Sequence, residues 1–596
     1  MTAHGKAPSP RLKVRPRNAA VEAAALALGY TPIQARVLAG RISDLSRPLS
    51  SLVRPSAADL DAPDSLPDID IAAGLLADAV ENAAPIAIVT DHDADGATSH
   101  AIIRLSLKQW GVAPEQVSGY LSHRMTEGYG VSDAFIDRVL PQLRPGTCII
   151  TADQGSSDEN RIARLRAAGH LVVVTDHHGI PEEGPPPSAH AVVNPVRQDS
   201  QFPDKAIAGC HTALLVMAAT REQLVRRGLL PGTIPKVSDL LDFCAVGTIA
   251  DASSLGQSRN NRLIVQRGLQ LMNKRPRPCW NAMRQLLNKE GPWCSSDIAF
   301  QIATRINARG RLGDAMLGVE FLCADDEETA FEMVQELDAN NRERRTIEGA
   351  LTRQAIDIAH AAVDAGRIGL CLWLGESAHA GVHGITASRI VEKFGCPTIC
   401  LSPAARDADL ATGSIRTTEV VHVRDTLTLI QQRWPGLLVS AGGHGGAGGL
   451  KVRRCDIEAL ADAWDVCVRE RYGQAVPEPT MLVDGDLEAP GLHHVIELAA
   501  LEPYGRGFDP PVFVGTWRIV DLCPIGDQTH LKLKLSRDSH LAEGVWFNAK
   551  LADAPPPVTI GQIARLAFSL DAQTYRGTTR LQLVIRGIEL NMEKNI

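Results

Sequence analysis

Residues 147–178 read TCIITADQGSSDENRIARLRAAGHLVVVTDHH, and this stretch decides the fold of its region. Two runs rich in β-branched residues, TCIITA (147–152) and LVVVT (171–175), enclose a segment, 157–168, whose pattern has a period nearer 3.6. Runs of the first kind predict buried strands, and a segment of the second kind predicts a helix. The stretch therefore predicts a strand, a helix and a second strand of one parallel sheet.

The same alternation continues on both sides of this stretch, from about residue 85 to residue 250. Further strand-like runs are PIAIVT (85–90), VSGYL (117–121) and AHAVV (189–193). Repeated strand and helix units predict a largely parallel sheet with helices on both faces. Ligands of such sheets bind beyond the carboxyl ends of the strands.

Acidic and imidazole side chains follow three of these predicted strands. They are Asp91, His92, Asp93 and Asp95 after PIAIVT, Asp153 after TCIITA, and Asp176, His177 and His178 after LVVVT. A single aspartate after a strand is usually a turn or helix-capping residue. Five aspartates at one sheet edge, however, would repel one another, and a divalent metal is the usual remedy. Oxygen-rich ligand sets with one or two imidazoles suit Mn²⁺ or Mg²⁺ better than zinc.

So many carboxylates can hold two ions. Two ions about 3.5–4 Å apart are the usual device for hydrolysing a phosphodiester. Asp251, which ends the apolar run LDFCAVGTIAD (241–251), is a further candidate ligand, although alone it would be interpreted as a helix N-cap. The residues thus predict a phosphodiester hydrolase with its metal centre at the carboxyl ends of the strands.

Later parts of the chain have different patterns. Residues 324–365 contain no proline and one glycine, Gly349, and would span about 60 Å if helical throughout. This segment predicts a connector between two lobes, although a break near Gly349 is equally compatible with it. Runs at 368–374 and 397–401 predict a second α/β lobe. From about residue 480, alternation such as Leu531, Leu533 and Leu535 between lysines predicts a small antiparallel β-barrel.

The composition is that of an ordinary globular protein. The 596 residues include 61 Lys and Arg against 69 Asp and Glu, a formal charge of −8, and 44% are apolar. These values exclude a disordered, collagenous or disulfide-scaffold chain and predict three to five domains. Taken alone, the negative charge argues against a polyanionic partner. The twelve cysteines form no C-x-x-C pair and no run of about 18 apolar residues occurs, so we expect a cytoplasmic protein without a membrane span.

The first 54 residues differ from the rest in charge. They hold nine Lys or Arg and two acids, a local charge of +7. The opening residues, MTAHGKAPSPRLKVRPR, are not followed by an apolar stretch and do not predict a secretory signal. We interpret them as a frayed tail.

An ordered series of motifs resembles a known family. DHDADGATS (91–99), TADQG (151–155) and DHH (176–178) resemble motifs of the DHH phosphoesterase superfamily, and the further motifs are similar to those of the RecJ family of single-strand-specific exonucleases. These are HRMTEGYG (123–130), VVNP (192–195), LDFCAVGTIAD (241–251), NRLIVQRGL (261–269), RINARGRLGDA (305–315), GVHGITASRIVEKFGCP (381–397), GSIR (413–416), GGHGGAGG (442–449) and PYGRGFDPPVF (503–513). The sequence departs from the family at His92, Gln154 and Thr304, where tyrosine, cysteine and proline are commoner.

The resemblance implies an α/β fold made of several domains. A parallel-sheet DHH domain would be joined by a long helix to a smaller α/β DHH-associated domain, followed by a C-terminal OB-like β-barrel. We place a basic N-terminal segment at 1–54, the DHH catalytic domain at 55–320, the connecting helix at 321–366, the DHH-associated substrate-binding domain at 367–475 and the barrel at 476–596.

The resemblance also implies roles at the metal centre. The ligands would be Asp91, Asp93, Asp95, Asp153, His177 and Asp251, with Asp153 bridging two ions and Asp95 either a ligand or a residue just behind the ligands. His178 would face the scissile phosphate. Asp176 would orient an imidazole, and its alternative is a cap.

Other residues would bind the DNA strand. The resemblance implies that Arg124, Ser414 and Arg416 grip a 5′-phosphate. Further contacts along the strand would come from Arg305, Asn307, Arg309, Arg311, Ser388, Arg389, Gly443 and His444. For the arginines at 305–311 the alternative is a solvated helix face, and for the glycine-rich run 442–449 it is a plain turn. In the barrel, Phe513, Trp517, Trp546 and Phe547 are available for base stacking, although core packing is the safer interpretation of each.

The family implies a metal-dependent, processive 5′→3′ exonuclease that degrades single-stranded DNA to 5′-mononucleotides with two Mn²⁺ or Mg²⁺ ions, in recombination and repair. We expect a monomer that contacts single-strand-binding protein and a recombination helicase. One alternative is a DHH phosphodiesterase for short oligonucleotides or cyclic dinucleotides, which would lack the long helix and the barrel. The other is a catalytically inactive scaffold, which predicts lost ligands, whereas this sequence retains all of them.

Overall fold

The computed structural model describes residues 10–589, apart from 44, 125, 129, 406, 444, 474–478, 527, 539, 551–554 and 576–577. The chain forms two compact units. Unit 1 comprises residues 1–49, 350–502 and 509–596, and unit 2 comprises residues 50–349 and 503–508. None of the helices in the described part of the chain combines the length and the apolar character that a membrane span requires.

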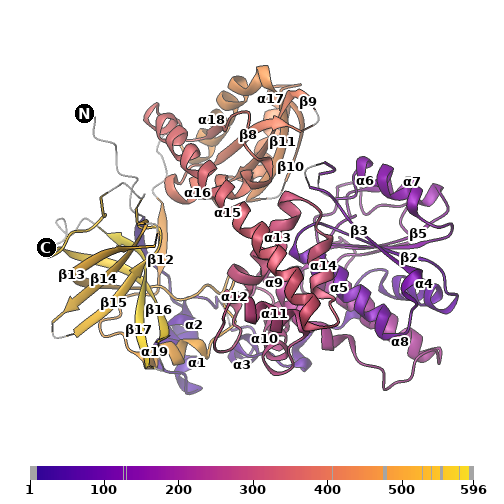
Figure 1. The fold of residues 1–596 in the computed structure, drawn as a ribbon, viewed down its shortest axis with the longest axis horizontal. Helices are drawn as coiled ribbons and strands as arrows, with labels where there is room; N and C mark the ends of the chain where they lie inside the picture. The colour runs from indigo at the N-terminus through magenta and orange to yellow at the C-terminus, as the bar shows by residue number, and fades with distance from the viewer. Residues whose placement is uncertain are drawn as a thin grey trace. The chain divides into compact units, whose positions relative to one another are not determined.

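Unit 2 is built around a five-stranded, entirely parallel sheet (Figure 1). Its spatial order is β3 (Val117–Leu121), β2 (Ile86–Thr90), β4 (Cys148–Ala152), β5 (Leu171–Thr175) and β6 (Ala191–Val193). The register pairs Thr90 with both Leu121 and Ala152, and Ala152 with Thr175. Four strands therefore end at the same level, which confirms the predicted parallel sheet and aligns the residues that follow these strands.

Helices cover both faces of this sheet because its strands are apolar on both sides. On one face lie α4 (Ile69–Glu81), α5 (Ala94–Gln109) and α8 (Gly209–Arg226). On the other face, α6 (Asp133–Val139) and α7 (Glu159–Ala167) share a core with Val89, Ile149 and Val174 of the sheet.

A helical layer completes unit 2. Its members are α9 (Leu241–Ala250), α10 (Arg259–Lys274), α11 (Pro278–Leu286), α12 (Ser295–Asp297), the π-helix η6 (Ile298–Ile302), α13 (Ala303–Leu312) and α14 (Met316–Leu322). The predicted long helix is α15 (Glu327–Asp364), a single helix of 38 residues that contributes to both units. It passes through Gly349 without interruption, so the alternative of a break there is wrong.

Unit 1 contains the second α/β lobe. Its sheet has the order β10 (Leu438–Gly443), β11 (Ala447–Arg453), β9 (Asp407–Arg416), β8 (Thr398–Ala404) and β7 (Leu370–Trp373), and only β7 and β8 are parallel. The helices are α16 (His383–Phe394), α17 (Val423–Arg433) and α18 (Ile457–Tyr472). Trp464 of α18 is fully buried in the core between sheet and helices.

Unit 1 also contains the predicted barrel, drawn in yellow in Figure 1. It closes in the order β13 (Phe513–Ile525), β14 (His530–Arg537), β15 (His540–Trp546), β17 (Thr578–Glu589) and β16 (Ile563–Tyr575). β15 and β17 are parallel and every other pair is antiparallel. Leu531, Leu533 and Leu535 are fully buried between exposed lysines, as their alternation predicts.

The N-terminal segment is folded onto this end of the chain, which corrects the interpretation of residues 11–17 as a frayed tail. β1 (Arg11–Val14) pairs in parallel with β12 (Thr480–Val483), and α1 (Ala19–Ala27) and α2 (Pro32–Ala39) follow. The buried guanidinium of Arg41 makes two hydrogen bonds to the Asp484 carboxylate, and Arg15 Nη2 lies 2.9 Å from Asp509 Oδ2. These arginines hold unit 1 together, so the local charge of +7 overstates the cationic surface of this segment.

Arg262 fastens the short segment 503–508 to the rest of unit 2. Its side chain is fully buried and donates from Nε to Val53 O (2.8 Å) and from Nη1 to Pro503 O (2.9 Å). Its Cζ lies 3.9 Å from the centre of the Phe508 ring. Nearby, Leu255 N donates to Arg506 O at 2.8 Å. A buried arginine with these contacts stabilises a connection between residues 241 positions apart in the sequence.

Arg262→Met tests this role. The substitution keeps much of the apolar stem but removes the guanidinium donor to Pro503 O and one of the two donors to Val53 O, which also accepts from Gln266 Nε2. We therefore expect the free energy of unfolding of unit 2 to fall by about 1–3 kcal/mol. Urea unfolding followed by tryptophan fluorescence measures the change. The matched control is Arg267→Met, an exposed position of the same helix, which should change stability by less than about 0.5 kcal/mol. Equal unfolding midpoints for both variants would contradict the assignment.

Candidate metal centre and nucleic-acid interface

The aligned strand ends bring the predicted metal residues together at one edge of the sheet. Asp91, Asp153 and Asp176 each follow directly after a buried strand. Asp153 has a φ of 61°, a left-handed conformation that is costly for a residue other than glycine. Strain of this kind is typical of functional sites. In this backbone conformation the Asp153 carboxylate lies among the other candidate ligands at this edge.

Three groups of ligand atoms, each within 4.8 Å of one another, occupy this edge. They are Asp91, Asp93 and Asp153; Asp95, His177 and Asp251; and Asp153, His177 and His178. All six residues that the resemblance implies as metal ligands are therefore close together. Asp153 and His177 each belong to two groups and form the centre of the set.

The environment of Asp153 Oδ1 and His177 Nε2 shows whether a cation fits this edge of the sheet. Both atoms are buried and lie 3.1 Å apart, yet neither makes a hydrogen bond to any residue that the structure describes. Neighbouring ligands of an octahedral ion with bonds of about 2.1 Å lie about 3 Å apart. One cation bound to both atoms would thus satisfy two buried polar groups at their present separation, so the residues fit Mn²⁺ or Mg²⁺.

The ionisation of these carboxylates supports the same conclusion. Burial, and then the negative charges of Asp95, Asp93 and Asp91, raise the pKa of Asp153 well above its usual value. Burial and the Asp251 carboxylate raise the pKa of Asp95 to about 6. The set therefore carries more negative charge than the protein's own groups neutralise, and bound divalent cations would remove this excess.

Asp93 and Asp95 are held by helix ends. Asp93 is the N-cap of α5, and its Oδ1 accepts hydrogen bonds from Asp95 N (2.9 Å) and Gly96 N (3.0 Å). Asp95 accepts from the first two amides of α8, Gly209 N at 2.8 Å and Cys210 N at 3.0 Å. Both oxygens of Asp95 are thus engaged, which favours the alternative that Asp95 lies just behind the ligands.

Both carboxylate oxygens of Asp176 accept hydrogen bonds that orient neighbouring residues. Its Oδ1 accepts from His177 N (2.7 Å), His178 N (3.1 Å) and His178 Nδ1 (2.8 Å), and its Oδ2 accepts from Ser156 N (3.0 Å). Burial alone would lower the pKa of His178, but the Asp176 carboxylate outweighs it and raises that pKa. The His178 side chain is 40% exposed and that of Asp176 only 2%, so the imidazole can reach a substrate while the carboxylate fixes its orientation.

Asp251 ends a helix instead of beginning one. It is the C-cap of α9, which corrects the alternative of an N-cap, and its Oδ2 accepts from Ser253 Oγ at 2.6 Å. Its carboxylate therefore lies where the macrodipole of α9 is negative, a position that disfavours an anion unless a cation is near.

Several residues that support the site were not predicted. Ser122 Oγ donates to Asp91 Oδ1 at 2.9 Å and lies 2.9 Å from His92 Nδ1. A methyl group on Gly209 would lie 2.7 Å from Asp153 Oδ1, and one on Gly96 would lie 2.2 Å from Asp91 O. Ser122 follows β3 directly, so the rule that found the carboxylates could also have found it.

An ion pair closes the loop that carries Arg124. Arg138 donates to both carboxylate oxygens of Glu127 and, at 2.8 Å, to Leu121 O. Glu127 Oε2 in turn accepts from His123 N at 2.9 Å. The residue after His123 is Arg124, so its backbone is fixed a few residues from Ser122 and the metal residues.

The four predicted contacts on α13 have different environments. Arg305 is 6% exposed and its guanidinium lies 2.9 Å from Asp338 of α15, so its burial does not favour contact with a strand. Arg309 is half-buried and donates to Asp314 O and Asn340 Oδ1, and Arg311 is also half-buried. Asn307 Oδ1 accepts from Ala94 N at 2.7 Å. Asn307 therefore ties α13 to the loop of the metal residues.

Unit 1 assembles the predicted phosphate residues in one sheet and one helix. Ser414 of β9 pairs with Gly449 of β11, and Gly448 pairs with Gly443 of β10. Arg416, the last residue of β9, lies against the start of α16, because a methyl group on Gly384 would be 2.8 Å from its Nη2. On α16, Ser388 Oγ donates to Gly384 O, and exposed Arg389 pairs with Glu392. His444 lies outside the described residues.

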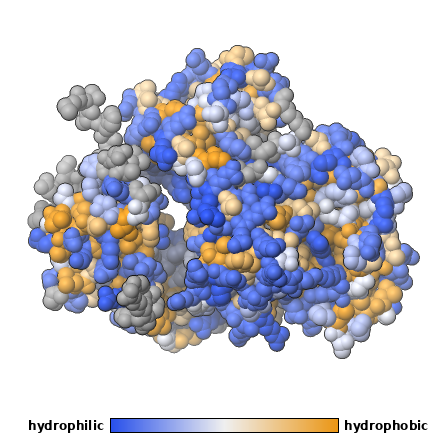
Figure 2. Space-filling view, in the orientation of Figure 1, coloured by the Kyte–Doolittle hydropathy of each residue, from blue (hydrophilic) through white to orange (hydrophobic). Residues whose placement is uncertain are grey.

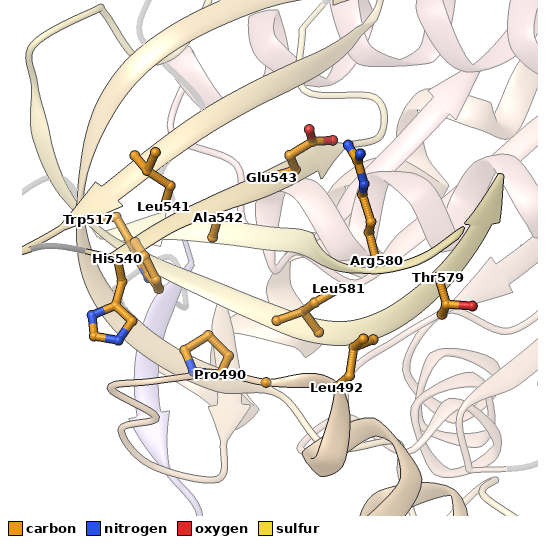
Figure 3. A pocket seen from close by; sticks show the side chains of 11 residues that line it. Pro490, Leu492, Trp517, His540, Leu541, Ala542, Glu543, Thr579, Arg580 and Leu581 are labelled. Carbon is orange, nitrogen blue, oxygen red and sulfur yellow. The ribbon is translucent and has the colours of Figure 1, made fainter. Parts of the chain in front are cut away.

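The barrel separates the predicted aromatic residues. Phe513 and Trp517 are fully buried, as the alternative of core packing predicts, whereas Phe547 is exposed and Trp546 is half-buried. Figure 2 shows apolar side chains among polar ones on the face of the barrel turned to the viewer. A pocket of about 420 Å³ lies on the barrel (Figure 3). It is lined by Pro490, Gly491, Leu492, Trp517, His540, Leu541, Ala542, Glu543, Thr579, Arg580 and Leu581.

Gly209→Ala tests how the helix end positions the metal residues. The new methyl group must displace the Asp153 carboxylate, so we expect Mn²⁺ binding to weaken about 10- to 100-fold in isothermal titration calorimetry. Gly74→Ala is the matched control, because Gly74 lies in α4 with open space around it and should leave the affinity unchanged. Unchanged Mn²⁺ affinity of a folded Gly209→Ala variant would show that the close packing is unimportant.

Comparison with known proteins agrees with this geometry. The model of the DHH family, N-terminal domain, matches residues 85–248, and that of the RecJ OB domain matches residues 483–587. The single-stranded-DNA-specific exonuclease RecJ of Haemophilus influenzae is 33% identical over 560 residues, which cover 92% of this chain and 93% of the relative. The protein of the same name from Escherichia coli is 32% identical over 537 residues, 88% of this chain and 90% of the relative.

Solved structures share this fold, with matches that cover nearly the whole chain. RecJ of Thermus thermophilus in complex with Mn²⁺ has a TM-score of 0.75 at 25% identity and covers 98% of this chain and 79% of the other. Its complex with Mg²⁺ has a TM-score of 0.69 at 25% identity and covers 96% and 77%. The residues, their arrangement and the relatives agree, and the chain belongs to the RecJ family of single-stranded-DNA-specific exonucleases.

Proposed function

We propose that this protein is a metal-dependent exonuclease that degrades single-stranded DNA from the 5′ end to 5′-mononucleotides. The observation that carries the proposal is the buried pair of Asp153 Oδ1 and His177 Nε2, surrounded by four further aspartates and without another hydrogen-bond partner in the described structure. RecJ structures solved in complex with Mn²⁺ and with Mg²⁺ support such cations as the cofactor, and the number of clustered ligands supports two of them. DNA recombination and repair are the proposed setting.

The metal-holding residues in this proposal are Asp91, Asp93, Asp153, His177 and Asp251, with Asp95 behind them or among them. When bound, two divalent cations would supply the Lewis acidity that makes water a nucleophile and offsets the charge of the phosphodiester. Asp153 would help to hold both ions, as the family resemblance implies, and its carboxylate belongs to two of the three ligand groups.

Two side chains of this protein, His178 and Asp176, would orient the substrate for hydrolysis. His178, partly exposed and with a raised pKa, would donate a hydrogen bond to an oxygen of the scissile phosphate. Asp176 would keep that imidazole in place through its bond to Nδ1. The positively charged imidazole would thereby stabilise the negative charge that the phosphate gains during attack.

The residues proposed to bind the strand are those that the family resemblance implies. Arg124, Ser414 and Arg416 would bind the 5′-phosphate. Asn307, Arg309 and Arg311 would line the path of the strand. Arg305 would support these residues through its ion pair with Asp338. Further phosphates would be contacted by Ser388, Arg389, Gly443 and His444. We also propose the domain boundaries given in the sequence analysis, which fall after residues 54, 320, 366 and 475.

The protein's surroundings belong to the proposal as well. Its partners would be single-strand-binding protein and a recombination helicase, and it would act as a monomer. All twelve cysteines are free thiols, which supports a reducing compartment such as the cytoplasm.

Two alternatives remain distinguishable from this proposal. A phosphodiesterase for short oligonucleotides would cleave a dinucleotide faster than a long 5′-phosphorylated strand, whereas the exonuclease would prefer the strand. A catalytically inactive scaffold would bind no Mn²⁺ at the strand ends, and calorimetry detects that binding directly. The retention of every predicted ligand disfavours the scaffold.

Degradation of end-labelled DNA tests both the direction in which the strand is degraded and the assignment of the metal centre. With Mn²⁺, a 5′-labelled single strand should release labelled mononucleotide at once, while a 3′-labelled strand shortens gradually and keeps its label. Asp153→Ala should slow both at least about 100-fold, because it removes the ligand shared by two groups. Its stability in EDTA should not fall, since the substitution relieves repulsion among buried carboxylates.

The control is Asp70→Ala, an exposed aspartate of α4, which should retain the parent rate. Duplex DNA and reactions without metal should yield no mononucleotide. Parent-rate degradation by a folded Asp153→Ala variant would refute the assignment of the site, and release of the 3′ label first would refute the direction.

A further inference from the structure

Phe300 is an aromatic side chain that neither the core nor the metal centre uses. It is 67% exposed, although its neighbours Ile298 and Ile302 are fully buried. It lies in η6, the π-helical turn that leads into α13. Exposing a phenyl ring costs free energy that burial would recover, and π-helical turns occur frequently at functional sites.

The exposed face of the helix connects Phe300 with the metal centre. Thr304 Oγ1 donates to Phe300 O at 2.9 Å, so the two residues lie one turn apart. Asn307, the next residue on this face, accepts from Ala94 N, between Asp93 and Asp95. The seven residue steps from Phe300 to Asn307 correspond to about 10 Å of helix. This is about the length of two or three nucleotides of a strand, whose stacked spacing is about 3.4 Å.

The chemistry around Phe300 fits a single nucleic acid strand. The segment 295–313 contains three arginines and one aspartate, and Arg309 and Arg311 are partly exposed beyond Asn307. Aromatic rings and cationic side chains along one surface are the usual means of binding unpaired bases, whose phosphates the cations attract while their faces stack on the rings. Here the ring and the two arginines belong to one continuous helical segment, nine and eleven positions apart. The bases of a duplex already stack on one another and would leave no face for the ring.

A protein partner fits this surface less well. Protein-binding patches expose a contiguous apolar area. Here the residues one turn before and after Phe300 are Ser296, which is exposed, and Thr304, which is half-buried and polar. A single ring with polar neighbours favours one stacked base over an apolar interface.

We propose that Phe300 is a stacking platform for one base of the bound DNA strand, about two or three nucleotides from the scissile phosphate. This assignment rests on the proposed exonuclease function. The ring would hold the strand on the exposed face of α13 and fix the register in which successive phosphates reach the metal centre. Because every base has an aromatic face, the contact would be independent of sequence.

The test combines variants of Phe300 with abasic strands. Binding of 5′-phosphorylated oligodeoxynucleotides is measured by fluorescence anisotropy in EDTA, so that the strand is not cut, with one abasic residue placed in turn at positions one to eight. Phe300→Ala should weaken binding of the intact strand roughly 5- to 100-fold, and Phe300→Trp should retain it. Phe300→Leu should resemble Phe300→Ala, because leucine is apolar but has no aromatic face.

Position dependence separates stacking from a loss of folding. An abasic residue at one position among the second to fourth should weaken binding by the parent protein, and Phe300→Ala should cause no further loss with that strand. Leu229→Ala, another exposed apolar residue of unit 2, should leave every affinity unchanged.

The proposal is overturned if Phe300→Ala binds as tightly as the parent, if Phe300→Leu does so, or if the loss is the same for all abasic strands. A parent protein that degrades no single-stranded DNA would overturn the proposed function itself. A parent that degrades the strand while Phe300→Ala shows no position-dependent loss would overturn only the stacking platform.

Discussion

Repulsion among buried carboxylates is the constraint on which the rest of this structure depends. Asp91, Asp93, Asp95, Asp153 and Asp251 lie in three groups whose ligand atoms are within 4.8 Å of one another. Asp91, Asp95 and Asp153 are buried, so water screens their charges little. The protein supplies partial compensation: Ser122 donates to Asp91, the first amides of α8 donate to Asp95, and two amides of α5 donate to Asp93. No comparable donor from the described residues reaches Asp153 Oδ1. A bound cation would therefore stabilise this oxygen more than it would stabilise the other carboxylates.

This constraint explains why glycines surround the site. A carboxylate can be brought against a helix end only if the helix presents a bare backbone, and Gly209 provides it, since a methyl group there would lie 2.7 Å from Asp153 Oδ1. Gly247 of α9 has the same property, because its methyl group would be 2.6 Å from Asp95 Oδ1. Gly310 lets α13 approach to within contact of His92 O. Three helices thus converge on the residues that follow β2 and β4 at distances that side chains would forbid.

Much of this arrangement could be predicted from the sequence, because it depends on periodicity and on strand ends. The parallel sheet, the long helix and the barrel follow from local patterns, and the strand ends give the acidic and imidazole candidates, from which the family resemblance implies the six clustered ligand residues. The pair of Glu127 and Arg138 could not be predicted in the same way, since its role depends on which loops meet in space. The pairing of β1 with β12 joins residues more than 460 positions apart, and four residues, RLKV, carry too little pattern to indicate it.

Counting charges is a poor guide to a nucleic-acid surface for a physical reason that three arginines illustrate. Arg41 binds Asp484, Arg262 lies over Phe508 among backbone carbonyls, and Arg305 binds Asp338, and all three are almost fully buried. Each adds +1 to the formal charge but contributes little to the field at the surface, because it is paired or surrounded by oriented dipoles. The aspartates of the metal centre act in the opposite sense, since two divalent cations would contribute +4 there. The formal −8 therefore reflects neither sign nor position of the field that a DNA strand would meet, which depends on partly exposed groups such as Arg309, Arg311 and His178.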